Sequence, residues 1–186
     1  SMTDSEWFWL LAAVGVFWAV GAYRRLMGLR AQVNKQFAVL EGMMLGYQSL
    51  VQDATTAAVT APASWHTAIA PEMGASHWTR LQVAANLSAM AIAHMQEHPL
   101  EPSSAVALVA TSRDLQAAWE ALTHPDVYYV SVPEELTRRW AELGIAIQPD
   151  LQRFNQTVQA YNEAISLFPA NLMAMLLKFK PGRVLE

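Results

Sequence analysis

The chain has 186 residues, of which 53% are hydrophobic and only 15% are charged, and its formal net charge is −4. That length supports one domain with its own core plus an appendage, and the apolar excess indicates that part of the chain leaves water or faces a partner. The acidic balance and the lack of a basic run exclude the charge pattern of a nucleic-acid-binding protein, and the absence of cysteine excludes disulfides and thiol chemistry.

An uncharged, strongly apolar run at residues 7–23 lies near the start of the chain. As a helix it covers roughly 25 Å, which is the short end of the range for a transmembrane helix. Trp7 and Trp9 at one end and Tyr23 at the other are typical of the aromatic belts at the two membrane interfaces, and Trp18 lies within the run. The run therefore predicts a membrane-crossing helix.

The charges on either side of this run separate a cleaved signal peptide from a retained anchor. A signal peptide would use Val20-Gly21-Ala22 as its small-residue cleavage site. However, Asp4 and Glu6 precede the run and Arg24 and Arg25 follow it, which is the reverse of a secretory signal. The positive-inside rule predicts a retained single-pass anchor, with the N-terminus outside and the body in the cytoplasm.

The residues after the anchor predict a long helix. Apolar residues alternate mostly three and four apart, a spacing typical of the inward stripe of a helix in a bundle or coiled coil. The stripe consists of Leu26, Leu29, Val33, Phe37, Leu40, Met44, Tyr47 and Val51. No proline precedes Pro62, so the anchor and this helix can form one continuous rod. Gly42 and Gly46 either allow a bend in it or let a neighbouring helix approach closely.

Prolines mark the next two helices. We expect a loop over residues 61–76, a helix over residues 78–97, and a third helix that begins at Pro102 and ends before Pro125. The periodicity predicts an inner face for each helix. The inner residues are Leu81, Ala85, Ser88, Ile92 and Met95 on the second helix and Val106, Val109, Leu115, Trp119 and Leu122 on the third.

Residues 127–132 form the one run typical of a β-strand, but a lone strand has no pairing partner, so we expect an extended connector. The last long helix begins after Pro133, where two glutamates suit the first turn. It should kink or break where it meets Gly144 and Pro149.

These elements together predict the fold class. We expect an all-α protein, an antiparallel up-and-down bundle of four long helices, the last of them kinked, with an N-terminal transmembrane helix. Residues 1–23 form the tail and anchor, and residues 24–186 form the helical bundle domain, which can be continuous with the anchor helix.

The most distinctive pattern lies in the last third of the chain. It reads Arg153-Phe154-Asn155, then Tyr161-Asn162, then Phe168-Pro169-Ala170-Asn171. Asn155 and Asn162 share one helical face, two turns apart. Asparagine is a poor helix former, so the pair indicates amides that hydrogen-bond to a neighbouring helix or backbone and set the register. The alternative is a polar strip for a partner.

This terminal pattern, together with a spaced pattern near the anchor, resembles the LemA family of bacterial membrane-anchored proteins. The residues that carry the resemblance are Tyr23, Leu26, Arg30, Arg153, Phe154, Asn155, Tyr161, Asn162, Phe168, Pro169 and Asn171. The resemblance implies an all-helical antiparallel bundle on a membrane anchor and no established catalytic activity. Residues 41–47 depart from the family pattern, because they lack its arginine pair and its proline.

One string matches a catalytic motif. His94, Glu97 and His98 fit the H-x-x-E-H pattern of inverted zinc peptidases, in which two histidines bind Zn²⁺ and a glutamate acts as general base. Glu120 or Asp126 can be proposed as a third ligand. The alternative is that histidines near a helix C-terminus complement the helix dipole. The sequence contains no G-x-S-x-G elbow and no phosphate-binding glycine loop, and we expect neither a catalytic residue nor a cofactor.

The sequence therefore predicts a non-enzymatic, membrane-anchored bundle. Its expected partners are the lipid bilayer and either an envelope protein or further copies of the chain, with no nucleic acid. Met43 and Met44, with loop residues Trp65 and Trp78, are expected to form an adaptable contact surface. One alternative is an oligomeric membrane-shaping protein whose segment 172–183 lies on lipid, and a remote one is a membrane-bound zinc hydrolase.

Overall fold

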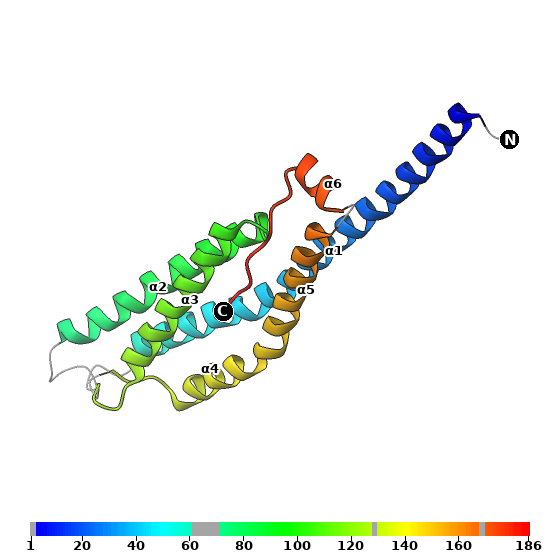
Figure 1. Ribbon diagram of the computed structural model, residues 1–186. Coiled ribbons are helices and arrows are strands. Elements are labelled where there is room, and N and C mark those ends of the chain that lie inside the picture. The colour runs from blue at the N-terminus through cyan, green and yellow to red at the C-terminus, as the bar shows by residue number, and fades with distance from the viewer. Residues whose placement is uncertain (1–2, 61–70, 128–129, 168–169) are drawn as a thin grey trace.

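The computed structural model describes residues 3–60, 71–127, 130–167 and 170–186, with only the backbone described at residues 60 and 71–74. This part of the chain contains six helices and no strand, so the predicted all-α class is confirmed. The helices run up and down beside one another (Figure 1). In chain order they are α1 (Asp4–Thr60), α2 (Pro71–Glu97), α3 (Pro102–Thr123), α4 (Glu134–Ala146), α5 (Gln148–Ser166) and α6 (Ala170–Leu176).

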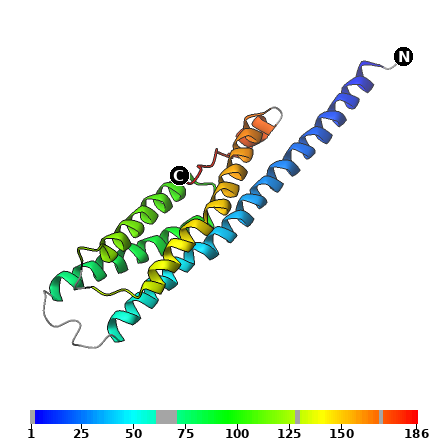
Figure 2. The same ribbon diagram turned by 90° about the horizontal axis from the view of Figure 1, so that it is seen from below.

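Helix α1 forms the spine of the molecule. It is 57 residues long and unbroken, and its first part projects beyond the other helices (Figures 1 and 2). In its second part the predicted stripe faces inward: six of its residues are buried and two, Leu29 and Met44, are half-buried. Helices α2, α4, α5 and α6 all pack against α1.

The two glycines predicted to matter in α1 differ in their surroundings. A Cβ added at Gly46 would lie 3.1 Å from Cδ2 of Leu143, so α4 approaches α1 closely there. A Cβ at Gly42 would have no neighbour within 4 Å. Gly46 therefore permits a close helix contact, whereas Gly42 has no such role.

Helices α2 and α3 form a hairpin. All five residues predicted for the inner face of α2 are buried. The predicted start of α2 was wrong, because the helix begins at Pro71, where a proline in the first turn costs no intrahelical hydrogen bond. Trp78 consequently lies within α2, is half-buried and packs against the core, so its expected place in an exposed loop was also wrong.

The predicted inner face of α3 is correct at four of five positions. Leu115, Trp119 and Leu122 are buried and Val109 is half-buried, but Val106 is 46% exposed. The first turns of α3 bury Ser104 and Ala105 in its place, because contact with α2 sets which side of α3 faces inward.

The predicted kink in the last long helix is a boundary between two helices. Helix α4 ends at Ala146 and α5 begins at Gln148, with Ile147 buried between them. Pro149 lies in the first turn of α5, where its missing N–H has no intrahelical partner to lose. The expected count of four long helices is therefore replaced by five helices of more than two turns and the short α6.

Aromatic side chains connect the helices in the core. Trp119 of α3 and Trp140 of α4 stack with ring centroids 4.1 Å apart, and Tyr47 of α1 meets the Trp140 ring edge-on at 4.6 Å. Phe37 and Phe154 form a second edge-to-face pair, at 6.0 Å, between α1 and α5. These contacts hold three helices on α1.

Several predicted features lie partly or wholly outside the described residues. Val127 and residues 130–132 form a connector without strand structure, as expected, and Val130 and Val132 pack against the core. The residues outside are Trp65 and His66 in the loop, Tyr128 and Tyr129 in the connector, and Phe168 and Pro169 in the terminal motif.

Candidate functional site

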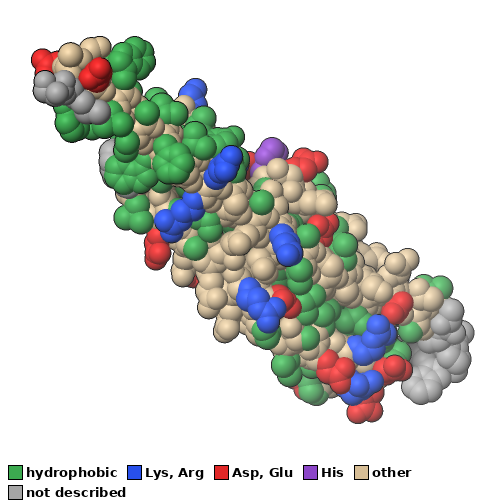
Figure 3. Space-filling view, turned by 90° about the vertical axis from the view of Figure 1, so that its right-hand side faces the viewer, with side chains coloured by type: hydrophobic (Ala, Val, Ile, Leu, Met, Phe, Trp, Pro, Cys, Tyr) green, Lys and Arg blue, Asp and Glu red, His purple; other side chains and the backbone are tan. Residues whose placement is uncertain are grey.

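The projecting part of α1 is apolar and uncovered. Among the described residues, α1 is the one helix that is long and apolar enough to cross a membrane. No residue in its most apolar stretch is buried. Trp7, Trp9 and Trp18 are each more than half exposed, and Arg24 and Arg25 follow where the body begins. Hydrophobic side chains cover this end, and Lys and Arg side chains appear where it joins the body (Figure 3).

The guanidinium of Arg30 lies between two aromatic side chains where α1 enters the body. Arg30 donates a hydrogen bond from Nη1 to the hydroxyl oxygen of Tyr161 at 3.1 Å, and its Cζ lies 4.3 Å from the ring centroid of Phe179. Tyr161 is fully buried, and so is Leu26 in the same cluster. This arrangement joins α1, α5 and the segment after α6, with a cation–π contact on one side of the guanidinium.

The two asparagines of α5 hold the C-terminal segment, residues 180–186. The amide of Asn155 donates to the carbonyl oxygen of Leu185 and accepts from its N–H, both at 2.7 Å. Asn162 does the same with Gly182, at 2.9 Å and 2.7 Å. Each amide thus pairs with a peptide group as a neighbouring strand would.

The spacing of these two pairs follows from chain geometry. Asn155 and Asn162 are seven residues apart, roughly 10 Å along a helix, and Gly182 and Leu185 are three apart, roughly 10 Å in extended chain. The chain passes close to its neighbours at Gly182, where an added Cβ would lie 2.8 Å from Cδ2 of Leu100 and would force that side chain to shift. The amides are used within the chain, which favours the structural interpretation of this motif over the polar strip for a partner.

The other residues of the terminal motif are spread over the body. Phe154 is fully buried, whereas Arg153 forms a surface ion pair with Asp150 at 2.9 Å. The Asn171 side chain accepts a hydrogen bond from the N–H of Leu172 at the start of α6. Gly182 and Leu185 did not figure in the sequence interpretation, although the seven-residue spacing of the asparagines could have pointed to an extended partner.

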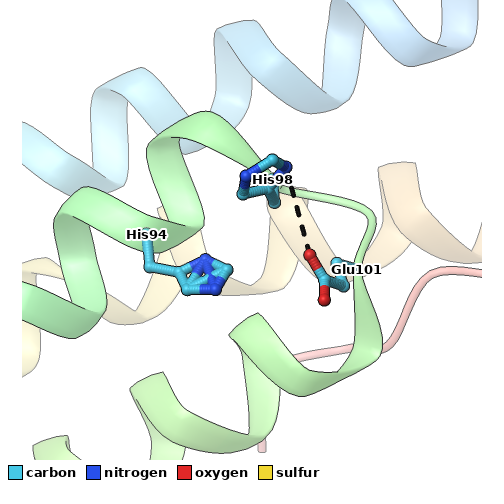
Figure 4. Close-up of side chains that lie close together, drawn as sticks. All are labelled: His94, His98 and Glu101. Carbon is cyan, nitrogen blue, oxygen red and sulfur yellow. Dashed lines mark ion pairs between the residues drawn. The ribbon is translucent and has the colours of Figure 1, made fainter.

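The histidines of the predicted zinc motif lie at the turn between α2 and α3 (Figure 4). His94, His98 and Glu101 are exposed, and each offers a ligand atom within 4.8 Å of the other two. Tetrahedral Zn²⁺ needs ligand atoms only about 3.3 Å apart, so the side chains would have to close in. His94 Nδ1 is within 3.2 Å of the buried hydroxyl of Ser104, which leaves its Nε2 for a ligand.

The third ligands proposed from the sequence lie elsewhere. Glu120 lines a cleft on the far part of α3, and Asp126 lies 3.5 Å from His124. Glu101 takes their place because the α2–α3 turn brings it back beside His98. Glu97, the predicted general base, is exposed and lines an open hollow of about 520 Å³ together with His98 and Glu101. The cluster offers exposed metal ligands beside this open hollow.

A cleft of about 540 Å³ lies between α1, α3, α4 and the end of the C-terminal segment. Its lining is mainly apolar and includes Met44, Trp140 and Leu151, together with the exposed Arg113. Burial raises the pKa of Tyr47, which also lines it, and a hydrogen bond with Gln116 opposes that shift. The volume is in the range of small-ligand pockets.

Comparison with known proteins extends these observations. The model of the LemA family matches residues 88–186, more than half of the chain, including the terminal motif. The pattern at Tyr23, Leu26 and Arg30 lies outside the matched residues. Comparison with curated proteins and with solved structures gave no match.

Proposed function

The chain belongs to the LemA family, and from that premise we propose that it is a non-enzymatic scaffold of the bacterial inner membrane. The N-terminus lies outside, the projecting part of α1 crosses the bilayer, and the bundle stands in the cytoplasm. There it holds envelope proteins, or further copies of itself, at a fixed place beside the membrane.

The continuity of α1 is the observation that carries this proposal. The same helix is uncovered and apolar over its first part and forms the spine of the bundle over its second. A break or flexible linker between anchor and body would let the bundle drift, whereas an unbroken helix transmits a fixed orientation. A rigid mount of this kind suits a protein that presents a surface.

Helix α2 supplies a surface for presentation. Val83, Leu87 and Met90 are four and three residues apart on its outward face, and each is about half exposed or more. Their inward neighbours are buried against α1 and α3, so this outer stripe is additional to the fold. An apolar stripe at helical spacing fits a partner helix laid along it.

Photo-crosslinking in intact cells tests the scaffold. A photoreactive phenylalanine analogue at Met90 would be compared with one at Gln159, an exposed polar position on α5. We expect reproducible crosslinks from position 90 to one protein or a few, and none of those products from position 159.

The identity of the products decides the kind of scaffold. A different envelope protein makes the chain an adaptor, and only self-crosslinks make it a homo-oligomeric assembly. The proposal is wrong if position 90 captures nothing and the full-length protein is a strict monomer in mild detergent.

Two other functions make different predictions. A membrane-shaping oligomer should change the form of liposomes that contain the full-length protein, and a scaffold should leave them unchanged. A zinc hydrolase should be purified with about one equivalent of Zn²⁺, since structural and catalytic sites hold the metal tightly. Metal analysis therefore tests the role of His94, Glu97 and His98 directly.

A further inference from the structure

We propose that α6 is a second membrane contact: its apolar tip, defined as Leu172, Met175 and Leu176, enters the headgroup region beside the transmembrane part of α1. This inference rests on the proposed anchor and adds a lipid-binding site on the bundle itself. With two contacts instead of one, the bundle has a fixed tilt and rotation on the membrane.

The outward face of α6 is apolar although it is exposed. Leu172, Met175 and Leu176 follow the i, i+3, i+4 spacing of one helical face, and they are 45%, 69% and 80% exposed. The opposite face of α6 packs against the bundle, where Ala174 is buried in the cluster that contains Leu26. A helix on the surface of a bundle in water typically carries polar residues on its outer side.

The location of α6 determines what covers this face. Ala174 packs in one cluster with Leu26, which is three residues, about 4.5 Å, beyond the last residue of the apolar run at Tyr23. The headgroup region on each side of a bilayer is roughly 5–8 Å thick. Figure 1 shows α6 at the end of the body from which α1 projects. When α1 crosses the membrane, the apolar tip therefore lies at headgroup depth.

The length of the span draws the body closer still. The uncharged run of 17 residues covers about 25 Å, less than the roughly 30 Å of a typical hydrocarbon core. A span that is too short is accommodated by thinning of the bilayer and by snorkelling of flanking residues, both of which bring the adjoining surface toward the lipid.

Exposed cationic side chains lie near the end of the apolar run and just after α6. Arg24 and Arg25 follow the run on α1, and Lys178 and Lys180 follow α6, all four exposed. Lys178 lies two residues after the end of α6 and has a positive φ of 58°, a conformation that costs a non-glycine residue about 1 kcal/mol or more. Glu97 and Glu101 line a hollow with Lys178 and Lys180, so the local charge is mixed, and the apolar side chains provide most of the contact.

Fluorescence from single labelled cysteines tests the contact, because the chain has no cysteine of its own. Full-length Met175→Cys, Met90→Cys and Val14→Cys would carry an environment-sensitive fluorophore in vesicles of phosphatidylcholine and phosphatidylglycerol. Met90, 68% exposed on α2, matches Met175 at 69% in residue type and exposure, and Val14 reports the span. Leu172→Cys repeats the reading at the tip if a label at 175 disturbs α6.

We expect the labels at 14 and 175 to be blue-shifted and to be quenched by lipids brominated on their acyl chains. The label at 90 lies on the stripe offered to a partner protein, and it should not be quenched. If the label at position 14 is quenched while the labels at positions 172 and 175 are unquenched, α1 still crosses the membrane but the second contact is wrong. A blue shift at 175 without quenching would mean that protein covers the tip, which also overturns the proposal. If the label at position 14 is also unquenched, α1 does not cross the membrane and the proposed anchor is wrong.

Discussion

The two parts of helix α1 lie in different environments although they form one continuous helix. Residues 4–25 and residues 26–60 are helical, rich in apolar side chains and joined without a break. In the first stretch no residue is buried, whereas the second buries a regular stripe under four other helices. The difference teaches that apolar content alone does not form a core. What matters is whether other segments fold back to cover it, and among the described residues none covers residues 4–25.

The largest expected effect comes from a pair of phenylalanines. Phe37→Ala, at 2% exposure, should cost the body about 3–5 kcal/mol of unfolding free energy, because a cavity is left between α1 and α5. Phe17→Ala, at 82% exposure, should change it by less than about 0.5 kcal/mol. Urea unfolding in detergent, followed by near-UV circular dichroism, measures both. Equal losses would contradict the division of α1 into two environments.

The next largest effect is expected where Asn162 of α5 holds the C-terminal segment. Asn162→Ala removes both bonds to Gly182 and should cost about 1–3 kcal/mol, with faster amide hydrogen exchange over residues 180–186. Asn86→Ala, exposed on α2, is the control, since it carries only the gain in helix propensity, up to about 0.7 kcal/mol. Unchanged exchange in Asn162→Ala would show that the segment is held by other contacts.

A glycine pair gives a smaller effect of the opposite sign. Gly42→Ala has open space for its Cβ and should stabilise the body by about 0.5–1 kcal/mol through reduced backbone entropy of the unfolded chain. Gly15→Ala has equally open space but lies in the projecting part, so the unfolding midpoint of the body should not move. Destabilisation by Gly42→Ala would indicate that α1 bends there.

The smallest change at neutral pH is expected from a tyrosine pair. Burial raises the pKa of Tyr47 above its ordinary 10.0, and a hydrogen bond with Gln116 lowers it in part. The folded state therefore holds this proton more tightly than the unfolded state does. The resulting stability is complete below pH 10.0 and is lost as the pH rises through the folded-state pKa.

Alkaline denaturation measures this difference. The unfolding free energy of the unmodified protein should fall more steeply above pH 10.0 than that of Tyr47→Phe. Tyr23→Phe, 43% exposed at the end of the apolar run, serves as the control and should keep the steep fall. Parallel curves for all three proteins would show that Tyr47 does not titrate on unfolding.

Local patterns predicted most of the helices and their inner faces. The α1 stripe and all five inner residues of α2 were correct, because a period of 3.6 identifies the covered side of a helix without reference to its partner. The errors occurred where packing decides. Val106 is exposed because the first turns of α3 bury Ser104 and Ala105 instead. Helix α2 starts before Trp78 because a proline fits a first turn.

The candidate sites depended more heavily on contacts between distant residues. The H-x-x-E-H string was visible, but the acidic residue that meets its histidines is Glu101, brought back by a turn, and neither Glu120 nor Asp126. The asparagine pair was visible too, whereas its partners, Gly182 and Leu185, lie 20 and 30 residues away and meet it only through the return of the chain.

The sequence by itself determined the fold class of this protein: which stretches are helical, which face of each helix is apolar, and which run of α1 is apolar on every side. These are properties of neighbouring residues and their period. The tertiary structure alone decided that α6 turns its apolar tip outward beside the apolar run, and that two amides hold the chain end. Both depend on the path by which distant segments return to α1, which no local pattern contains.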